Sequence, residues 1–205
     1  MNKKKKIAIT ITSLSLLFVV AIGASLAYFT DKDNKENTVT MGNIDISLKE
    51  TMEENGKEVP YKDPVNVKPG QTVSKIPNIK NESGINDCYV RAIITITNPK
   101  GADPLLTIAD LNIAAGWNVV SISANSWYCY CNSVIAPNAI VQPFTKVLIP
   151  EKWSNIVSNT ELKIDIVAEA IQADNFTPEK DGANNITAWK FSDGSFVTPE
   201  TYVKK

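Results

Sequence analysis

The sequence predicts an all-β protein, an antiparallel β-sandwich of jelly-roll-like form with one short helix. Three observations support this prediction. Apolar and polar residues alternate over several short segments, residues typical of turns separate these segments, and a helix start signal occurs at one place. Several short strands joined by turns are typical of sandwiches and jelly rolls.

The first strand is expected over residues 38–49. Its apolar residues occupy odd positions at the beginning and even positions at the end. A β-bulge at Gly42 and Asn43 would bring both halves onto one face, because glycine accommodates the bend. The charged segment 50–63 is then expected to form an exposed hairpin or loop.

The clearest strand is expected over Cys88–Thr97, after a tight turn at Pro69 and Gly70. The one short helix is expected over 103–111, where Asp103 can act as N-cap and a proline follows in the first turn. The two faces of the expected strand Cys88–Thr97 differ in their side chains. One face carries Cys88, Val90, Ala92, Ile94 and Ile96, and the other carries Tyr89, Arg91, Ile93 and Thr95.

Four further strands are expected at Trp117–Ser123, 126–132, 140–149 and 161–171. In the last of these, alternate apolar residues from Leu162 to Ala170 should point inward. The charged residues between them should point outward; they are Lys163, Asp165 and Glu169. The polar segment after residue 172 contains candidates for a satellite core, namely Trp189, Phe191 and Phe196.

Residues 1–27 have the three parts of a secretory signal peptide. A block of four lysines precedes an apolar segment, and small side chains then occupy the two positions that a signal peptidase recognises. Cleavage is therefore expected between Ala27 and Tyr28. The alternative is an uncleaved N-terminal anchor, because the uncharged segment is long enough to span a bilayer. The remaining chain divides into a linker, 28–37, and a β-sandwich domain, 38–205.

The charge of the expected mature chain argues against a nucleic-acid partner. The 205-residue chain has 21 basic and 22 acidic residues. Removal of residues 1–27 takes away four lysines and no acids, which leaves 21 − 4 = 17 basic residues and a net charge of −5. Arg91 is the only arginine. Together with the expected signal peptide, this charge predicts a secreted or cell-surface protein that does not bind nucleic acid.

The chain contains no histidine. This absence excludes histidine-dependent catalytic triads and histidine-ligated zinc sites. Phosphate-binding glycine loops and nucleophile-elbow motifs are also missing from the sequence. We accordingly expect no enzymatic activity, no catalytic residues, no cofactor and no metal.

Three cysteines, Cys88, Cys129 and Cys131, are candidates for a disulfide. Their number is odd, so at least one is free or bonded to another chain. Cys129 and Cys131 should lie on one face of a strand, where a bond between them would be poor in geometry. A bond from Cys88 to either of them is one interpretation. Three buried thiols is the other.

The four tryptophans and the glycosylation patterns each have two interpretations. Trp117, Trp127, Trp153 and Trp189 could form a sugar-binding face, but packing in the core is the interpretation we favour. Three Asn-x-Ser/Thr patterns begin at Asn81, Asn175 and Asn185. Such patterns often arise by chance, and we favour that interpretation over glycosylation.

Several segments, in this order, resemble the TasA/camelysin family of exported proteins. The junction Ala27-Tyr28-Phe29-Thr30-Asp31 is similar to that of substrates of the SipW-type signal peptidase. The segments that resemble the family are 37–46, 68–71, 81–84, 88–92, 127–130, 143–150 and 168–173. Cys129 and Cys131 stand where aromatic residues would be expected.

The resemblance implies a jelly-roll-like sandwich, exported by Gram-positive bacteria, that assembles into extracellular or biofilm matrix fibres. In such fibres an N-terminal segment of one subunit adds as a strand to the next subunit. Here the donor would be about 28–41, and its candidate anchors are Tyr28, Phe29, Val39 and Met41. The implied partners are other copies of the chain, the SipW-type signal peptidase and accessory matrix proteins.

Other functions remain as alternatives. One is a monomeric binding or adhesion domain at the cell surface, which would bind a polymer or host ligand without forming filaments. Another is a camelysin-like metallopeptidase, since relatives of this type carry that description. A type IV pilin is a further alternative, although a pilin keeps its apolar helix and the small-residue site here follows the apolar segment.

Overall fold

The computed structural model describes residues 38–40, 44–64, 67–153, 157, 160–190 and 193–196, with the backbone alone at 38–40 and at Asn175. Several predictions concern other parts of the chain. The signal peptide 1–27, the cleavage site and most of the donor segment lie outside the described residues. The same holds for the anchors Tyr28, Phe29 and Met41, for the bulge at Gly42 and Asn43, and for Phe191.

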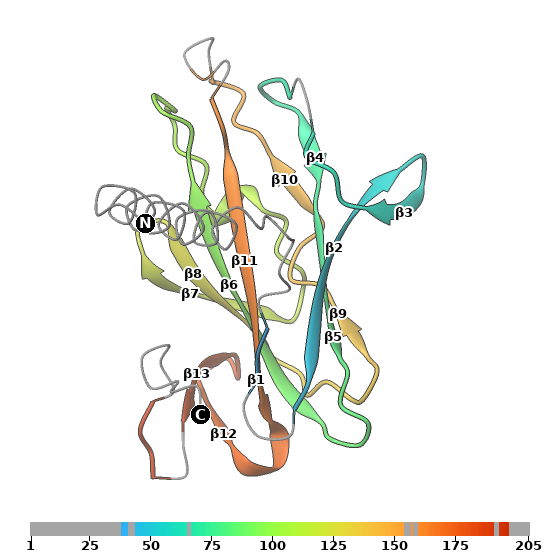
Figure 1. Cartoon of the computed structure of the whole chain (residues 1–205). Helices are drawn as coiled ribbons and strands as arrows, with labels where there is room; N and C mark the ends of the chain where they lie inside the picture. Colours follow the sequence, from blue (N-terminus) through green and yellow to red (C-terminus); the bar gives the residue numbers. More distant parts are fainter. Residues whose placement is uncertain are drawn as a thin grey trace, which may run out of the picture. The chain divides into compact units, whose positions relative to one another are not determined.

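The structure confirms an antiparallel, sandwich-like all-β fold (Figure 1). The five-stranded sheet has the order β1 (Thr38–Thr40), β11 (Lys163–Gln172), β6 (Cys88–Thr97), β8 (Ser126–Cys131), β7 (Trp117–Ser123). The four-stranded sheet has the order β3 (Lys57–Pro60), β2 (Ile46–Glu54), β5 (Ile76–Asn81), β9 (Ile140–Val141). Two small sheets join β10 (Lys146–Leu148) to β4 (Thr72–Ser74) and β12 (Thr177–Lys180) to β13 (Ile186–Lys190). Within the described residues, no helix reaches the length and apolarity needed to cross a membrane.

The main core lies between the two large sheets and follows the predicted alternation. In β6 the predicted apolar face is buried along its whole length, with Val90, Ala92 and Ile94 fully inaccessible to solvent. On the neighbouring strand β11, Ile166 pairs with Ile94 and Ala168 pairs with Ala92. Both β11 residues belong to the same core cluster. Burial of these side chains contributes the main favourable free energy of folding.

The prediction of one bulged strand over 38–49 is wrong. Residues 38–40 form β1 in the five-stranded sheet, whereas β2 begins at Ile46 in the four-stranded sheet. The slip in alternation therefore accompanies a change of sheet between β1 and β2. The predicted strand 140–149 is wrong for the same reason, because β9 and β10 lie in different sheets.

The predicted helix over 103–111 is also wrong. Only a 3₁₀ turn, η1 (Ile108–Asp110), forms there, and its N-cap is Thr107 instead of Asp103. The backbone of Leu106 explains the difference: its N–H donates to the Asn98 side chain at 2.8 Å, and its carbonyl accepts from the same side chain at 2.9 Å. These bonds use the backbone groups that a helix would need.

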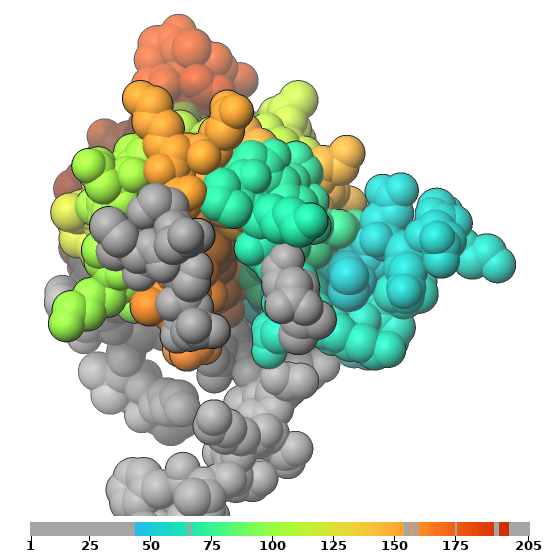
Figure 2. All heavy atoms as spheres, turned by 90° about the horizontal axis from the view of Figure 1, so that it is seen from above, coloured from blue at the N-terminus to red at the C-terminus, as the bar shows by residue number. Residues whose placement is uncertain are grey.

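Two predicted turns are confirmed. The segment 50–63 contains the β2–β3 hairpin, which turns at Asn55 and Gly56, both with positive φ. Figure 2 shows this hairpin, in cyan, standing out from the rest of the described chain. At the second turn, the N–H of Gln71 donates to the carbonyl of Lys68 at 3.1 Å, and Gly70 has a φ of 74°.

Asn81 links two loops, the β5–β6 loop and the β8–β9 loop. Its side-chain amide donates to the carbonyl oxygens of Asn86 at 2.9 Å and Ile135 at 3.0 Å, and its Oδ1 accepts from the N–H of Ser83 at 3.0 Å. The residue is fully buried. A role in packing therefore explains the pattern at Asn81 better than glycosylation.

Replacement Asn81→Ala is expected to lower the free energy of unfolding by about 2–4 kcal/mol, because buried carbonyl and N–H groups lose their partners. Urea denaturation followed by circular dichroism measures this change. The control is the exposed Asn125→Ala, for which we expect a change below about 0.5 kcal/mol. Equal effects of the two variants would contradict the role of Asn81.

Candidate functional site

The edge of the five-stranded sheet at β1 is the candidate functional site. There β1 pairs with β11 in a parallel sense, with Thr38 opposite Ala168 and Thr40 opposite Ala170. The other strand pairs in the described part of the chain are antiparallel. Since β1 covers only three residues of β11, the first half of β11 (163–167) has no strand partner on this side among the described residues.

A buried ion pair lies next to this edge. Nε of Arg91 on β6 donates to Oε2 of Glu169 on β11 at 2.5 Å, and Nη1 of Arg91 donates to the Tyr130 hydroxyl at 3.0 Å. Arg91 is fully buried, and Glu169 is 3% exposed. Burial alone would lower the pKa of Arg91, but the attraction of Glu169 raises it above its ordinary value. In register, Glu169 stands between Arg91 on one side and Val39 of β1 on the other.

Aromatic rings enclose the guanidinium group of Arg91. Its Cζ lies 4.2 Å from the centre of the Tyr128 ring, 4.4 Å from Trp189 and 5.6 Å from Tyr130. Trp189 comes from β13, so the C-terminal β12–β13 hairpin packs over the outer face of the five-stranded sheet (Figure 1). Each such contact of a cation with an aromatic face is favourable, and more so when water is excluded.

A second, smaller core lies under the β12–β13 hairpin, and it corrects one prediction and confirms part of another. Glu169 lies on the predicted outer face of β11, but that face is covered and Glu169 is buried. The satellite core exists: its buried residues are Tyr130, Ile171, Ile186 and Trp189. Phe196 is half exposed and lies against Lys190, at 4.7 Å from its Nζ.

The three cysteines lie in the main core and are free thiols in this structure. Burial raises the pKa of Cys88 and of Cys129 to about 12, and it also raises the pKa of Cys131. These thiols are therefore neutral near pH 7 and poor nucleophiles or metal ligands. The arrangement matches the interpretation of three buried thiols; the disulfide between Cys88 and a β8 cysteine stays a prediction.

The tryptophans serve mainly as core residues, as favoured from the sequence. Trp127, Trp153 and Trp189 are 9%, 7% and 0% exposed. The indole N–H of Trp153 donates to the carbonyl of Pro104 at 2.7 Å. Trp117 differs, because it is only half buried and borders an open cleft.

Comparison with known proteins assigns the chain to a family. The family model of the camelysin metallo-endopeptidases matches residues 2–104. The chain belongs to the camelysin family. TasA is a member of the same family, so the resemblance found in the sequence is confirmed. No curated protein and no solved structure shows significant similarity to this camelysin-family chain.

The description of the family implies a catalytic metal, and the residues of this chain do not fit one. The sequence has no histidine. The buried thiols have raised pKa values and are protonated near pH 7. In the part of the chain that the structure describes, no three cysteine or carboxylate side chains are grouped as metal ligands. We therefore derive no metal-dependent step for this family member.

The ion pair predicts a large effect of a single substitution. Glu169→Ala should lower the free energy of unfolding by about 3–5 kcal/mol, because Arg91 would be left buried without its counter-charge. Chemical denaturation of the folded chain measures this loss. The matched control on the same strand is Asp165→Ala, which breaks an exposed pair with Lys163 and should cost less than about 1 kcal/mol. A cost for Glu169→Ala no larger than the control would contradict the role of the pair.

The buried thiols predict a loss of stability at alkaline pH. The unfolded chain releases thiol protons near pH 9, whereas the folded chain holds those of Cys88 and Cys129 up to about pH 12. The folded state thus binds more protons in this interval, and the free energy of unfolding should fall as pH rises from about 9 to 12. Urea denaturation with reductant at several pH values measures the slope.

Cys129→Ala should make the fall of the unfolding free energy between pH 9 and 12 shallower, because one buried thiol is removed. At pH 8 a thiol reagent should label the cysteines only after unfolding. Rapid labelling of the folded chain, or an unchanged slope in the variant, would show that the thiols are not held neutral by burial.

Proposed function

We propose that this camelysin-family protein is an exported structural subunit that assembles into extracellular fibres by N-terminal donor-strand addition. Membership of the family supports export, since its members are generally extracellular or associated with the cell surface. The donor would be the segment 28–41, with Tyr28, Phe29, Val39 and Met41 as anchors. The observation that carries the proposal is the parallel pairing of β1 with the edge of β11.

The register of that pairing supports a longer donor strand. Extended backwards by five residues, it would place Asp33 opposite Lys163 and Lys35 opposite Asp165. Both pairs have opposite charges. Lys163 and Asp165 already form an exposed ion pair at 2.8 Å, so the donor would complete an alternating group of four charges on one face of the sheet.

The same contacts can be made within one chain or between two chains. If the donor of one subunit occupies the β11 edge of the next, the backbone bonds of β1 are exchanged rather than lost. Each subunit then receives a donor at one edge and offers its own to another subunit. Because this head-to-tail contact does not close on itself, repetition produces a filament.

Processing would control assembly. Before cleavage between Ala27 and Tyr28, the donor is tied to the apolar segment and is not free to reach another subunit. In this proposal the partners are copies of the chain, a SipW-type signal peptidase and accessory matrix proteins. The protein acts without a cofactor, without nucleic acid and without enzymatic activity. The lack of histidine in the sequence supports the last point, because the metal ligand most common in metallopeptidases is missing.

Deletion of residues 28–37 is expected to prevent fibre formation, because it removes the donor ahead of β1. Electron microscopy and sedimentation of the processed protein measure assembly. Fibres that form equally well without this segment would overturn donor-strand addition. Saturable binding to a surface polymer with no filaments at any concentration would instead favour a monomeric adhesion domain.

A charge exchange tests the register itself. The double change Lys163→Glu with Asp165→Lys keeps the net charge but places like charges opposite Asp33 and Lys35, so the critical concentration should rise several-fold. The compensating changes Asp33→Lys and Lys35→Asp should restore assembly in that background. As a control, the same exchange at the surface pair Lys80 and Glu82 should leave assembly unchanged. Failure of the compensation would rule out this register.

A further inference from the structure

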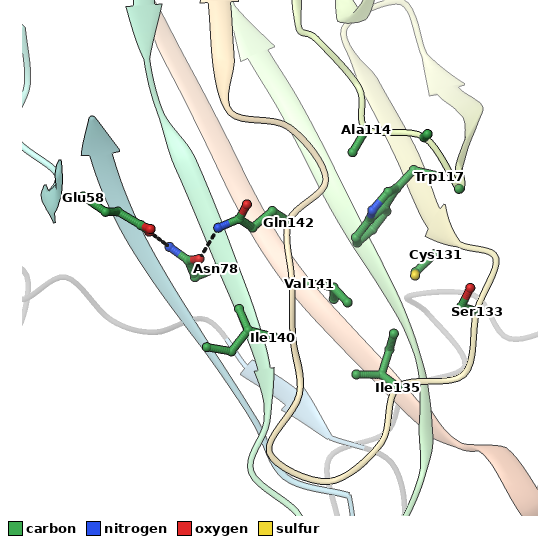
Figure 3. A pocket seen from close by; sticks show the side chains of 12 residues that line it. Glu58, Asn78, Ala114, Trp117, Cys131, Ser133, Ile135, Ile140, Val141 and Gln142 are labelled. Carbon is green, nitrogen blue, oxygen red and sulfur yellow. Dashed lines mark hydrogen bonds between the residues drawn. The ribbon is translucent and has the colours of Figure 1, made fainter. Parts of the chain in front are cut away.

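An open cleft of about 600 Å³ lies at the side of the five-stranded sheet where β7 is the edge strand (Figure 3). Its lining comes from both large sheets. Glu58 of β3 and Asn78 of β5 belong to the four-stranded sheet, and Trp117 of β7 belongs to the five-stranded sheet. In the sheet order β7 is at the end opposite to β1. The cleft is thus separate from the candidate assembly edge, and its volume is typical of ligand sites.

One side of the cleft is a chain of polar side chains. Nε2 of Gln142 donates to Oδ1 of Asn78 at 2.7 Å, and Nδ2 of Asn78 donates to the Glu58 carboxylate at 2.8 Å. Thr51 also donates to Glu58. These bonds fix the orientation of the polar groups before any ligand arrives. Within the described residues, Oε1 of Gln142 and the hydroxyl of Ser133 have no hydrogen-bond partner, so both remain available.

The other side of the cleft is aromatic. The Trp117 ring lies across from Gln142 and Asn78 (Figure 3). Trp117 is half buried, whereas the other three tryptophans have at most 9% of their surface exposed. A half-buried indole in the lining, near amide, hydroxyl and carboxylate groups, offers both apolar contact and hydrogen bonds.

We propose that this cleft binds a neutral saccharide, with Trp117 stacked on a sugar ring and Gln142, Ser133 and Glu58 bonded to its hydroxyl groups. A pyranose ring has one face of C–H groups, which packs on an indole, and a rim of hydroxyls that both donate and accept hydrogen bonds. The cleft supplies this combination. A peptide strand would instead need a row of free backbone groups along the cleft. Of the two edge strands there, β9 has only two residues, and β7 contributes Trp117 alone to the lining.

Charge selects a neutral sugar. Hydrogen bonds from Thr51 and from Asn78 lower the pKa of Glu58, so its carboxylate is ionised near pH 7. The expected mature chain is itself acidic, at −5. Both charges repel a polysaccharide that carries carboxylates. This selectivity separates the proposal from nonspecific adsorption to polymers.

The test uses the protein as processed by the cells that produce it. Three soluble probes are compared: dextran, an oligomer of N-acetylglucosamine, and polygalacturonate as the acidic polymer. Retardation in gels that contain each polymer, together with the shift in tryptophan fluorescence on titration, measures binding. We expect saturable binding of a neutral probe and a fluorescence change that Trp117→Phe alters, because Trp117 is the tryptophan in the cleft.

Trp117→Ala should weaken binding about tenfold, as expected for loss of an aromatic contact of about 1.4 kcal/mol. Gln142→Leu, which leaves the core untouched, should also weaken it and keeps the test valid if Trp117→Ala does not fold. Ile122→Ala, an exposed change on the same strand, is the control and should bind as the unchanged protein does. Lack of binding to both neutral probes, stronger binding of polygalacturonate, or unchanged binding in Gln142→Leu and in a folded Trp117→Ala would overturn the proposal. None of these outcomes depends on whether fibres form.

Discussion

The buried pair of Arg91 and Glu169 is the constraint on which the rest of the five-stranded sheet depends. Neither charge could be buried alone, because an isolated ion inside a protein costs several kcal/mol. Each therefore requires the other at one position of the β6–β11 register. Arg91 also requires the Tyr130 hydroxyl, which aligns β8. A shift of one residue between these strands would separate the charges and turn the apolar faces outward.

The pair also explains why the C-terminal hairpin is part of the domain. Tyr128, Tyr130 and Trp189 surround the guanidinium and keep water from it. Without β13 this face would expose the rings of Tyr128 and Tyr130, together with a charge pair that is much weaker in water. The covered face and the β1 edge thus meet at β11, where Glu169 stands between Arg91 and Val39 in the register. The register that the ion pair fixes between β6 and β11 therefore also sets the position of the edge where β1 pairs.

Alternation predicted the strands well where one strand stays in one sheet, as in β6 and in most of β11. It failed where the chain changes sheets, because odd and even positions define a face but not the sheet to which that face belongs. This is why 38–49 and 140–149 looked like single strands. It also could not show that β12–β13 covers Glu169, since burial of an outward charge depends on a distant segment. The sequence did hold one indication of the ion pair. Arg91 is the only arginine and lies in a regular strand, and the expected strand 161–171 carries Asp165 and Glu169.

The two sites lie at opposite edges of the five-stranded sheet, and this arrangement has a consequence for a fibre. In the proposed fibre, strand addition would use the β11 edge next to β1, whereas the cleft at Trp117 lies beside β7 and would stay open in each subunit. A filament would then present the cleft once per subunit along its length. A single cleft of this kind, with one aromatic ring and a few hydrogen bonds, binds weakly. When a polymer engages several clefts, each further contact forms at high effective concentration, so the total affinity exceeds that of one site by orders of magnitude. If both proposals hold, weak recognition by one subunit would therefore be sufficient for firm attachment of a fibre to a polysaccharide.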